Sequence, residues 1–352
     1  MRAISRWTLI VFGGVTSLAA ALGGQASAPG ADLLDQLHFR SIGPAVMSGR
    51  VTDFAVDEGQ SSIFYVGTAH SGVWKTLNGG TTFTAEFQDQ GLMSIGAIAV
   101  SPANPDVVWI GTGEGNNRQS TSWGDGVWKS ADGGRTWTHC GLETSYHINR
   151  IALDPVHPNV VFVAAQGSLF GPGGARGVYR TTDGGTTWTA VLTVDENTGA
   201  NEVLFDPTNR RILYASTYER QRSQCCFDGG GPGSGIWKSV DGGDHWTRMT
   251  AGLPQGDLGR IGLAVYRRSP NILYALIEAE GGGRGAGRGG APGAATAADA
   301  GSGLFRSDDA GASWRRTSAQ DPRPMYFSQV RIDPNNPDRV ITAGVQIFLS
   351  TD

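Results

Sequence analysis

Residues 113–126 gather side chains that could bind a ligand or move a proton. This glycine-bounded stretch carries two carboxylic acids, an amide, a guanidinium and an indole. They are Glu114, Asn117, Arg118, Trp123 and Asp125. Charged and amide groups bind hydroxyls and carboxylates, and an indole offers a sugar ring or a peptide an apolar platform. The stretch therefore predicts part of a binding or catalytic site.

Later segments add further candidates. Hydrolysis of a glycosidic bond needs two carboxyl groups that flank the bond, and the candidate catalytic residues are Glu114, Asp125, Glu202 and Glu219. The candidate ligand-binding residues are Asn117, Arg118, Trp123, His147, Arg150, Tyr218 and Arg220. Structural roles stay open beside these functional ones. Arg150 and Glu202 could pair around a central channel, Glu114 could form a local salt bridge with Arg118, and Trp123 could cover apolar neighbours.

Other kinds of chemistry find no support in the sequence. The formal net charge is -4 and no basic run occurs, so a nucleic-acid partner is not expected. The glycine-rich stretch 111–115 lacks the Gly-Lys-Ser/Thr of a phosphate loop, and the chain contains neither a His-Glu-x-x-His zinc helix nor a Gly-x-Ser-x-Gly nucleophile motif. We therefore expect no cofactor and no metal.

Three cysteines, Cys140, Cys225 and Cys226, are too few for a disulfide scaffold or a zinc site. Two interpretations remain open at this stage. Either all three are thiols without function, or one bridge forms that involves Cys140 or the adjacent pair.

A repeated turn organises the elements that must position these residues. Its pattern is (Ser/Thr)-x-(Asp/Asn)-x-Gly-x-x-(Trp/Phe), and copies begin at residues 76, 130, 181, 239 and 307, with a cut-off copy at 350. Glycine permits positive φ, and the Asp or Asn side chain accepts hydrogen bonds from turn amides. One carboxylate per turn is too few for calcium. We therefore assign a structural role to Asn78, Asp132, Asp183, Asp241 and Asp309.

A second repeat alternates with these turns and consists of an apolar strand, an Asp-Pro-type turn and a β-branched strand, as in 151–163. Each unit thus has four short strands, A to D, in about 40 to 50 residues, which is typical of a β-propeller blade. We predict an all-β propeller of four-stranded blades, about five and a half of them. The blades span roughly 51–90, 91–142, 143–194, 195–252, 253–318 and 319–352, the last incomplete.

The N-terminal residues 1–28 read as a secretory signal peptide, with Arg2 and Arg6 before an apolar run and small residues near Ala28. A membrane anchor is the alternative, although the run is short for a bilayer span. Residues 29–50 follow as a lead-in strand, and 279–303 form a low-complexity Gly/Ala loop within blade five. We expect an exported protein, periplasmic, on the outer surface or extracellular, that is not an integral membrane protein after signal cleavage.

The two rims of such a propeller differ in sequence. The A–B and C–D turns, which share one rim, are short and uniform, whereas the B–C loops 113–126, 166–177 and 218–235 vary in length and are polar. Loops on a rigid scaffold are where binding and catalysis concentrate. We therefore expect the ligand on the rim of the B–C loops, called the loop face below; the opposite rim is the turn face.

The repeated turn matches the Asp-box or BNR repeat, and over residues 37–352 the chain resembles bacterial sortilin/VPS10-like BNR proteins, with a more distant resemblance to xyloglucanases and sialidases. The resemblance implies a ring of ten blades or two rings of seven. Because the sequence ends inside a sixth turn, we expect a fragment of a larger ring or of tandem propellers. Xyloglucanases carry an aspartate in a Thr-Asp-x-Gly-Gly context in the first blade, where this chain has Thr68-Ala69-His70-Ser71-Gly72.

The predicted function is that of an exported propeller that binds a peptide, protein or glycan through its loop face. The alternative is a glycoside hydrolase of xyloglucanase or sialidase type, acting on polysaccharide with a carboxylate pair. The missing aspartate favours the binding function.

Overall fold

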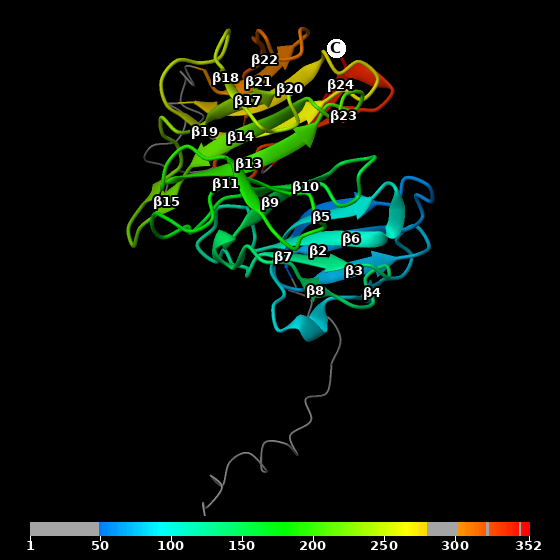
Figure 1. Cartoon of the computed structure of the whole chain (residues 1–352). Coiled ribbons are helices and arrows are strands. Elements are labelled where there is room, and N and C mark those ends of the chain that lie inside the picture. Colours follow the sequence, from blue (N-terminus) through cyan, green and yellow to red (C-terminus); the bar gives the residue numbers. More distant parts are fainter. Residues whose placement is uncertain (1–48, 280–300, 322–323, 345) are drawn as a thin grey trace, which may run out of the picture. The chain divides into compact units, whose positions relative to one another are not determined.

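The computed structural model describes residues 49–279, 301–321, 324–344 and 346–352. These residues form β-strands joined by turns and two short 3-10 helices, Gln88–Gln90 and Glu143–Ser145. The strands build six antiparallel blades that follow one another along the chain (Figure 1), five with four strands and the last with three, and a separate two-stranded ribbon. The predicted all-β propeller of four-stranded blades is confirmed.

The first three blades show the repeated strand order most simply. Blade one contains β1 (Val51–Val56), β2 (Phe64–Thr68), β3 (Val73–Thr76) and β4 (Thr84–Ala85). Blade two contains β5 (Ile95–Ser101), β6 (Asn104–Thr112), β7 (Val127–Ser130) and β8 (Thr138–His139). Blade three contains β9 (Ile148–Leu153), β10 (Val161–Ala165), β11 (Gly177–Thr181) and β12 (Thr189–Leu192).

The remaining blades repeat this order with one insertion. Blade four contains β13 (Thr198–Phe205), β14 (Leu213–Glu219), β17 (Gly235–Ser239) and β18 (Thr247–Met249), with a small ribbon, β15 (Gln221–Arg222) and β16 (Phe227–Asp228), in its B–C loop. Blade five contains β19 (Leu258–Val265), β20 (Leu273–Ala279), β21 (Gly303–Ser307) and β22 (Arg315–Ser318). Blade six contains β23 (Gln329–Asp333), β24 (Asn336–Ala343) and β25 (Ile347–Ser350).

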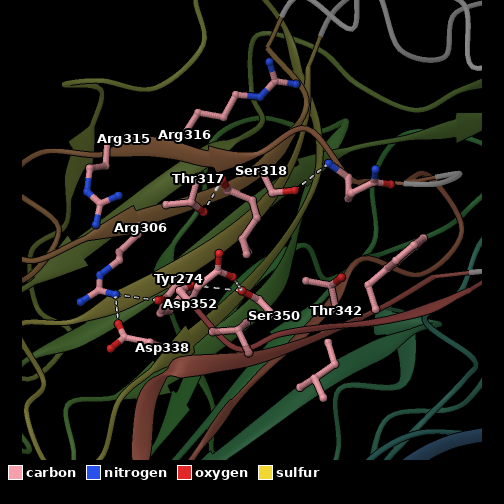
Figure 2. Close-up of a pocket in the computed structure, with 15 residues that line it drawn as sticks. Tyr274, Arg306, Arg315, Arg316, Thr317, Ser318, Asp338, Thr342, Ser350 and Asp352 are labelled. Carbon is pink, nitrogen blue, oxygen red and sulfur yellow. Dashed lines mark hydrogen bonds and ion pairs between the residues drawn. The ribbon is translucent and has the colours of Figure 1, made fainter.

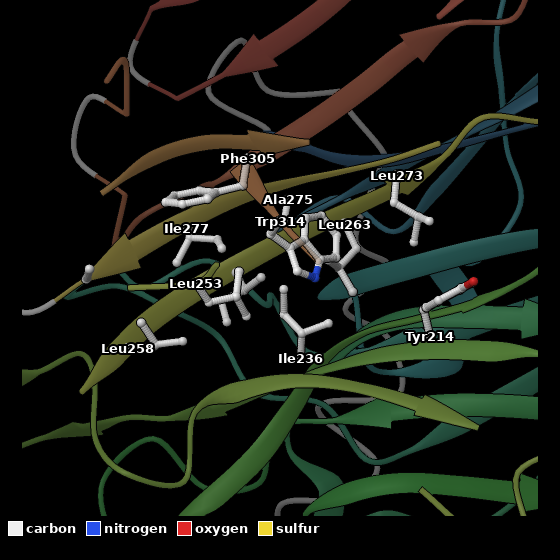
Figure 3. Close-up of a cluster of buried hydrophobic side chains, with 12 residues drawn as sticks. Tyr214, Ile236, Leu253, Leu258, Leu263, Leu273, Ala275, Ile277, Phe305 and Trp314 are labelled. Carbon is white, nitrogen blue, oxygen red and sulfur yellow. The ribbon is translucent and has the colours of Figure 1, made fainter. Parts of the chain in front are cut away.

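The hydrophobic core lies between neighbouring sheets. Figure 3 shows one cluster in which Tyr214 and Ile236 of blade four pack with Leu263, Leu273 and Phe305 of blade five. Burying one such large apolar side chain contributes about 1.5–3 kcal/mol. Because a single blade cannot cover its own apolar faces, this packing makes each blade depend on its neighbours.

The repeated turns fold as their sequence predicts. In blade two, Asp132 Oδ1 accepts hydrogen bonds from Ser130 Oγ (2.8 Å) and from Thr136 N (2.9 Å), and the φ angle of Gly133 is 72°. Hydrogen bonds from the Thr136 hydroxyl and amide hold the pKa of Asp132 at about 2. All of these contacts lie within one turn.

The basic residue before each turn has a role that the sequence did not reveal. Lys75 Nζ donates to the carbonyl of Gly133 in the next blade at 2.7 Å, and Lys129 Nζ donates to the carbonyl of Gly184 at 3.3 Å. The same Lys75 lies 5.1 Å from the centre of the Tyr65 ring. These lysines therefore join neighbouring blades on the turn face.

Candidate functional site

Glu114 is fully buried and is bound by an arginine that the sequence analysis did not single out. Arg50 Nε donates to Glu114 Oε1 at 2.9 Å, and Arg50 Nη2 donates to Oε2. The expected local salt bridge between Glu114 and Arg118 is wrong, because the partner lies 64 residues away in the sequence. Arg118 is half-buried, and its guanidinium makes no hydrogen bond with the described residues.

Arg50 also selects the tautomer of the neutral imidazole of His70, which lies beside it. Arg50 Nη2 lies 3.1 Å from His70 Nε2, and His70 Nδ1 lies 3.0 Å from Ser122 Oγ. A guanidinium only donates, so His70 Nε2 must accept and Nδ1 must carry the proton that it donates to Ser122. In this tautomer the imidazole cannot take the proton of the Ser122 hydroxyl. His70 and Ser122 therefore do not form a nucleophile–base pair.

A hollow of about 490 Å³ opens beside these residues on the loop face. Its lining includes His70, Met93, Ser122, Trp123 and Phe170. Trp123 is 65% exposed and Phe170 57%, so both rings face solvent. This apolar rim next to hydrogen-bonding groups is the surface on which a flat ligand can stack.

Four other predicted ligand-binding residues lie inside the protein. Asn117, His147, Tyr218 and Arg220 are at most 2% exposed. The expectation that they line an exposed loop surface is wrong, because they close the loop side of the propeller from different blades. Asn117 Nδ2 donates to the Tyr218 hydroxyl at 2.9 Å, across 101 residues of sequence. Burial, with the charge of Arg220, holds the pKa of His147 well below its usual range.

Arg150 and Glu202 pair near the axis, as their structural interpretation predicted. Arg150 Nε donates to Glu202 Oε2 at 2.7 Å, and Arg150 Nη1 lies 3.5 Å from Asp53 Oδ1. These residues come from the first strands of blades one, three and four. Asp53 was not among the predicted residues, because its only signal in the sequence is a carboxylate inside an apolar strand.

The two other candidate carboxylates hold loops in place. Asp125 Oδ1 accepts from Thr112 Oγ1 at 3.1 Å and from Trp128 Nε1 at 2.9 Å. Glu219 Oε2 accepts from the amide of Gly233 at 3.0 Å. Together with Glu114 and Glu202, every candidate catalytic carboxylate thus has partners of its own, and no two of the four share one.

The described residues form two more hollows. One of about 530 Å³ follows the first strands and includes Arg150 in its lining. Another, of about 700 Å³, lies between blades five and six (Figure 2), where Arg306 Nη1 donates to the Tyr274 hydroxyl at 2.9 Å and also to Asp338. None of the candidate site residues lines the hollow of Figure 2.

The cysteine alternatives have an outcome. Cys225 and Cys226 form a disulfide between adjacent residues, and Cys140 is free. Within the described ranges, no group of three His, Cys, Asp or Glu side chains could hold a metal ion. In the same ranges no helix is long and apolar enough to cross a bilayer. The predicted signal peptide and most of the lead-in strand lie outside the described residues.

The described residues form a β-propeller with a hollow bordered by aromatic rings on its loop face. Known proteins resemble it in sequence. Residues 125–260 match the family model of sortilin, neurotensin receptor 3. The chain is 26% identical over 322 residues to a xyloglucanase from a Paenibacillus species, a match that covers 89% of this chain and 25% of that protein. A xyloglucanase from Acetivibrio thermocellus is 31% identical over 114 residues, 30% of this chain and 12% of that protein.

Solved structures agree on the fold. The GH74 enzyme of Niastella koreensis superposes with a TM-score of 0.60 at 19% identity, over 85% of this chain and 44% of that one. The GH74 xyloglucanase of Xanthomonas campestris gives 0.60 and 19%, over 84% of this chain and 44% of that one. The chain therefore spans less than half of the length of these relatives. The resemblance to sortilin-like and xyloglucanase propellers predicted from the turns is confirmed.

Proposed function

We propose that this exported protein binds a polysaccharide of the xyloglucan type through the hollow on its loop face. One observation carries the proposal: Trp123 and Phe170, both largely exposed, border a hollow that also presents His70 and Ser122. Flat apolar rings stack on the faces of sugar rings, and neighbouring polar groups reach the hydroxyls. The similarity to xyloglucanases supports a glucan ligand over a peptide or protein.

Glycoside hydrolysis is the second candidate, and the same relatives favour it. Against it stands Ala69, at the position that matches the xyloglucanase aspartate; Ala69 is buried, and its amide donates to the carbonyl of Arg50 at 2.9 Å. The carboxylate of Glu114 lies close by but is already held by both edge nitrogens of Arg50. The described residues thus support binding, while the similarity to xyloglucanases supports bond cleavage at least as well.

Affinity electrophoresis in gels containing xyloglucan, mixed-linkage glucan or no polysaccharide tests the proposal. We expect xyloglucan to retard the wild-type protein and Trp123→Ala to abolish the retardation. Leu77→Ala is the matched control, because Leu77 is 61% exposed but belongs to a turn on the opposite rim. Equal mobility of the wild-type protein in all three gels would contradict the binding proposal.

An assay for reducing ends released from xyloglucan distinguishes polysaccharide binding from glycoside hydrolysis. We expect the wild-type protein to release no reducing ends. If wild-type protein releases reducing ends and Glu114→Gln does not, hydrolysis replaces binding as the function. If both proteins are inactive while retardation persists, binding stands.

A further inference from the structure

Three buried arginines behind the loop face differ in how their guanidinium groups are satisfied. Arg176 donates to five backbone carbonyls, with all three of its nitrogens engaged. Arg260 donates from Nη1 to two carbonyls and from Nη2 to Asn149 Oδ1, which leaves Nε without a partner among the described residues. Arg220 donates only from Nη1, to Asn117 Oδ1. Its Nε and Nη2 are buried and have no hydrogen-bond partner in the described part of the chain.

The unoccupied nitrogens of Arg220 lie on one edge of the guanidinium, and two other arginines show what this edge binds. Arg50 holds Glu114 through Nε and Nη2. Arg150 holds Glu202 through the same two atoms, at 2.7 and 3.3 Å. In both pairs the two parallel N–H groups match the two oxygens of a carboxylate. Arg220 has the same pair of donors, but no carboxylate among the described residues binds them.

The surroundings of Arg220 are positively charged. Arg222 lies two residues further on, and its Nε is also buried without a partner within the described ranges. Burial lowers the pKa of Arg220 to about 9, and the charges of Arg260, Arg176 and Arg222 act in the same direction against the opposing effect of Tyr218. A buried cation with unused donors and cationic neighbours is unfavourable unless an anion compensates it.

The residue that accepts from Arg220 is itself held in place by other blades. Asn117 accepts from Arg220 and donates both to the Tyr218 hydroxyl and to the backbone carbonyl of Met325. These contacts join the loop of blade two, the end of β14 and the segment before β23. Because the acceptor of Arg220 Nη1 is itself held by two further hydrogen bonds, the guanidinium loses less conformational entropy on binding a ligand than a free side chain would.

We propose that Arg220 is the centre of an anion site in which its Nε and Nη2 bind the carboxylate of a small organic acid. This site goes beyond the proposed polysaccharide binding, because Trp123 and Phe170 take no part in it. The same pair of donors in Arg50 and Arg150 holds a carboxylate in this protein, and the same carboxylate chemistry is present in acetate and in a free uronic acid.

Thermal midpoints of the full-length protein, titrated at constant ionic strength with sodium acetate, glucuronate, sulfate or chloride, test the proposal. We expect acetate and glucuronate to raise the midpoint by a saturable few degrees, and sulfate and chloride to do less. A response to glucuronate alone would assign the carboxylate to a sugar acid, and a response to both would assign it to small carboxylates in general. A shift of equal size with every anion would overturn the proposal.

Substitutions test whether the stabilisation by carboxylates depends on Nε and Nη2 of Arg220. Arg220→Lys keeps the charge but loses the paired donors, so carboxylate affinity should fall by about tenfold or more. Arg118→Lys is the matched control on the same face and should respond like the wild type. Trp123→Ala should also respond like the wild type, which separates this site from the polysaccharide site. An unchanged response in Arg220→Lys would overturn the proposal.

A measurement on the wild-type protein covers the case in which Arg220→Lys does not fold. Crystals grown with and without acetate should differ by planar density against Nε and Nη2 of Arg220. Water alone at this edge in the acetate-grown crystals would refute the site.

Discussion

Replacement of Tyr218 should be far more damaging than replacement of Trp123, although the sequence suggests that both are surface ligand contacts. Tyr218 is 0% exposed and its hydroxyl accepts from Asn117 Nδ2, whereas Trp123 is 65% exposed. Truncation of a large buried aromatic side chain costs about 3–5 kcal/mol. An exposed loop substitution changes the free energy of unfolding by about 0.5 kcal/mol or less.

Tyr218→Phe isolates the hydroxyl from the ring. The Asn117 amide keeps the Met325 carbonyl as an acceptor for one of its N–H groups, but the group that donated to the hydroxyl is left buried without a partner, so this variant should lose about 1–3 kcal/mol. With a midpoint shift of about 2–4 °C per kcal/mol in domains of moderate size, Tyr218→Ala should melt about 6–20 °C below the wild type. Tyr218→Phe should melt about 2–12 °C below it.

Differential scanning calorimetry and urea unfolding measure the stabilities to be compared. The variants are Tyr218→Ala, Tyr218→Phe and Trp123→Ala. The expected order of midpoints is Trp123→Ala near the wild type, then Tyr218→Phe, then Tyr218→Ala. A Tyr218→Ala protein that melts within a degree of Trp123→Ala would refute the buried position of this ring.

Three further outcomes are expected. Burial raises the pKa of Glu278 from 4.5 to about 7, so the unfolded chain loses this proton at a lower pH than the folded protein does. The free energy of unfolding should therefore fall as pH rises from 4.5 to 7. Urea titrations at several pH values should show that Glu278→Gln removes this pH dependence. Gly96→Ala places a Cβ against the carbonyl of Ile148 and should cost about 1–3 kcal/mol, whereas Gly171→Ala, with nothing within 4 Å, should melt like the wild type. The turn hydrogen bonds lower the pKa of Asp132 to about 2, so Asp132→Ala should be less stable than the wild type at neutral pH. This difference in stability should disappear as pH falls from 3.8 to 2, where the wild-type carboxylate becomes protonated. The variant should still be retarded by xyloglucan, because Asp132 lies on the turn face.

The features that the sequence predicted well are those whose causes are local. A repeated turn places its glycine, its carboxylate and its hydroxyl within a few residues, so the sequence pattern alone could assign Asp132 and Ser130 to one hydrogen-bonded turn. The alternation of apolar and polar residues likewise predicted the strands. Both signals repeat along the chain, and each copy supports the others.

The partners and the burial of the candidate site residues could not be predicted, because the groups that contact them are distant in sequence. Arg118 was the nearest cation to Glu114 along the chain, but the fold supplies Arg50 from 64 residues away. Tyr218 and Arg220 read as polar loop residues until the packing of several blades encloses them. Burial of a loop residue depends on neighbours that no local pattern contains.

The two rims of the propeller are stabilised in different ways, and this difference bears on how mutations propagate. On the turn face, Lys129 reaches only the next blade, through the carbonyl of Gly184. On the loop face, Asn117 bonds with Tyr218 and Met325, and thereby joins blades two, four and six. In a repeat protein, contacts between nearest neighbours let blades unfold in part, whereas contacts across the axis require several blades to open together.

Hydrogen exchange can detect this difference. Lys129→Met should raise amide exchange in blades two and three alone, because the lost contact lies between them. Asn117→Leu removes the contacts that Asn117 makes across the axis and should raise exchange in blades two, four and six together. If both variants affect only their own blade and the next, the polar contacts behind the loop face do not couple the blades, and the fixed position of Arg220 would have to come from β14 alone.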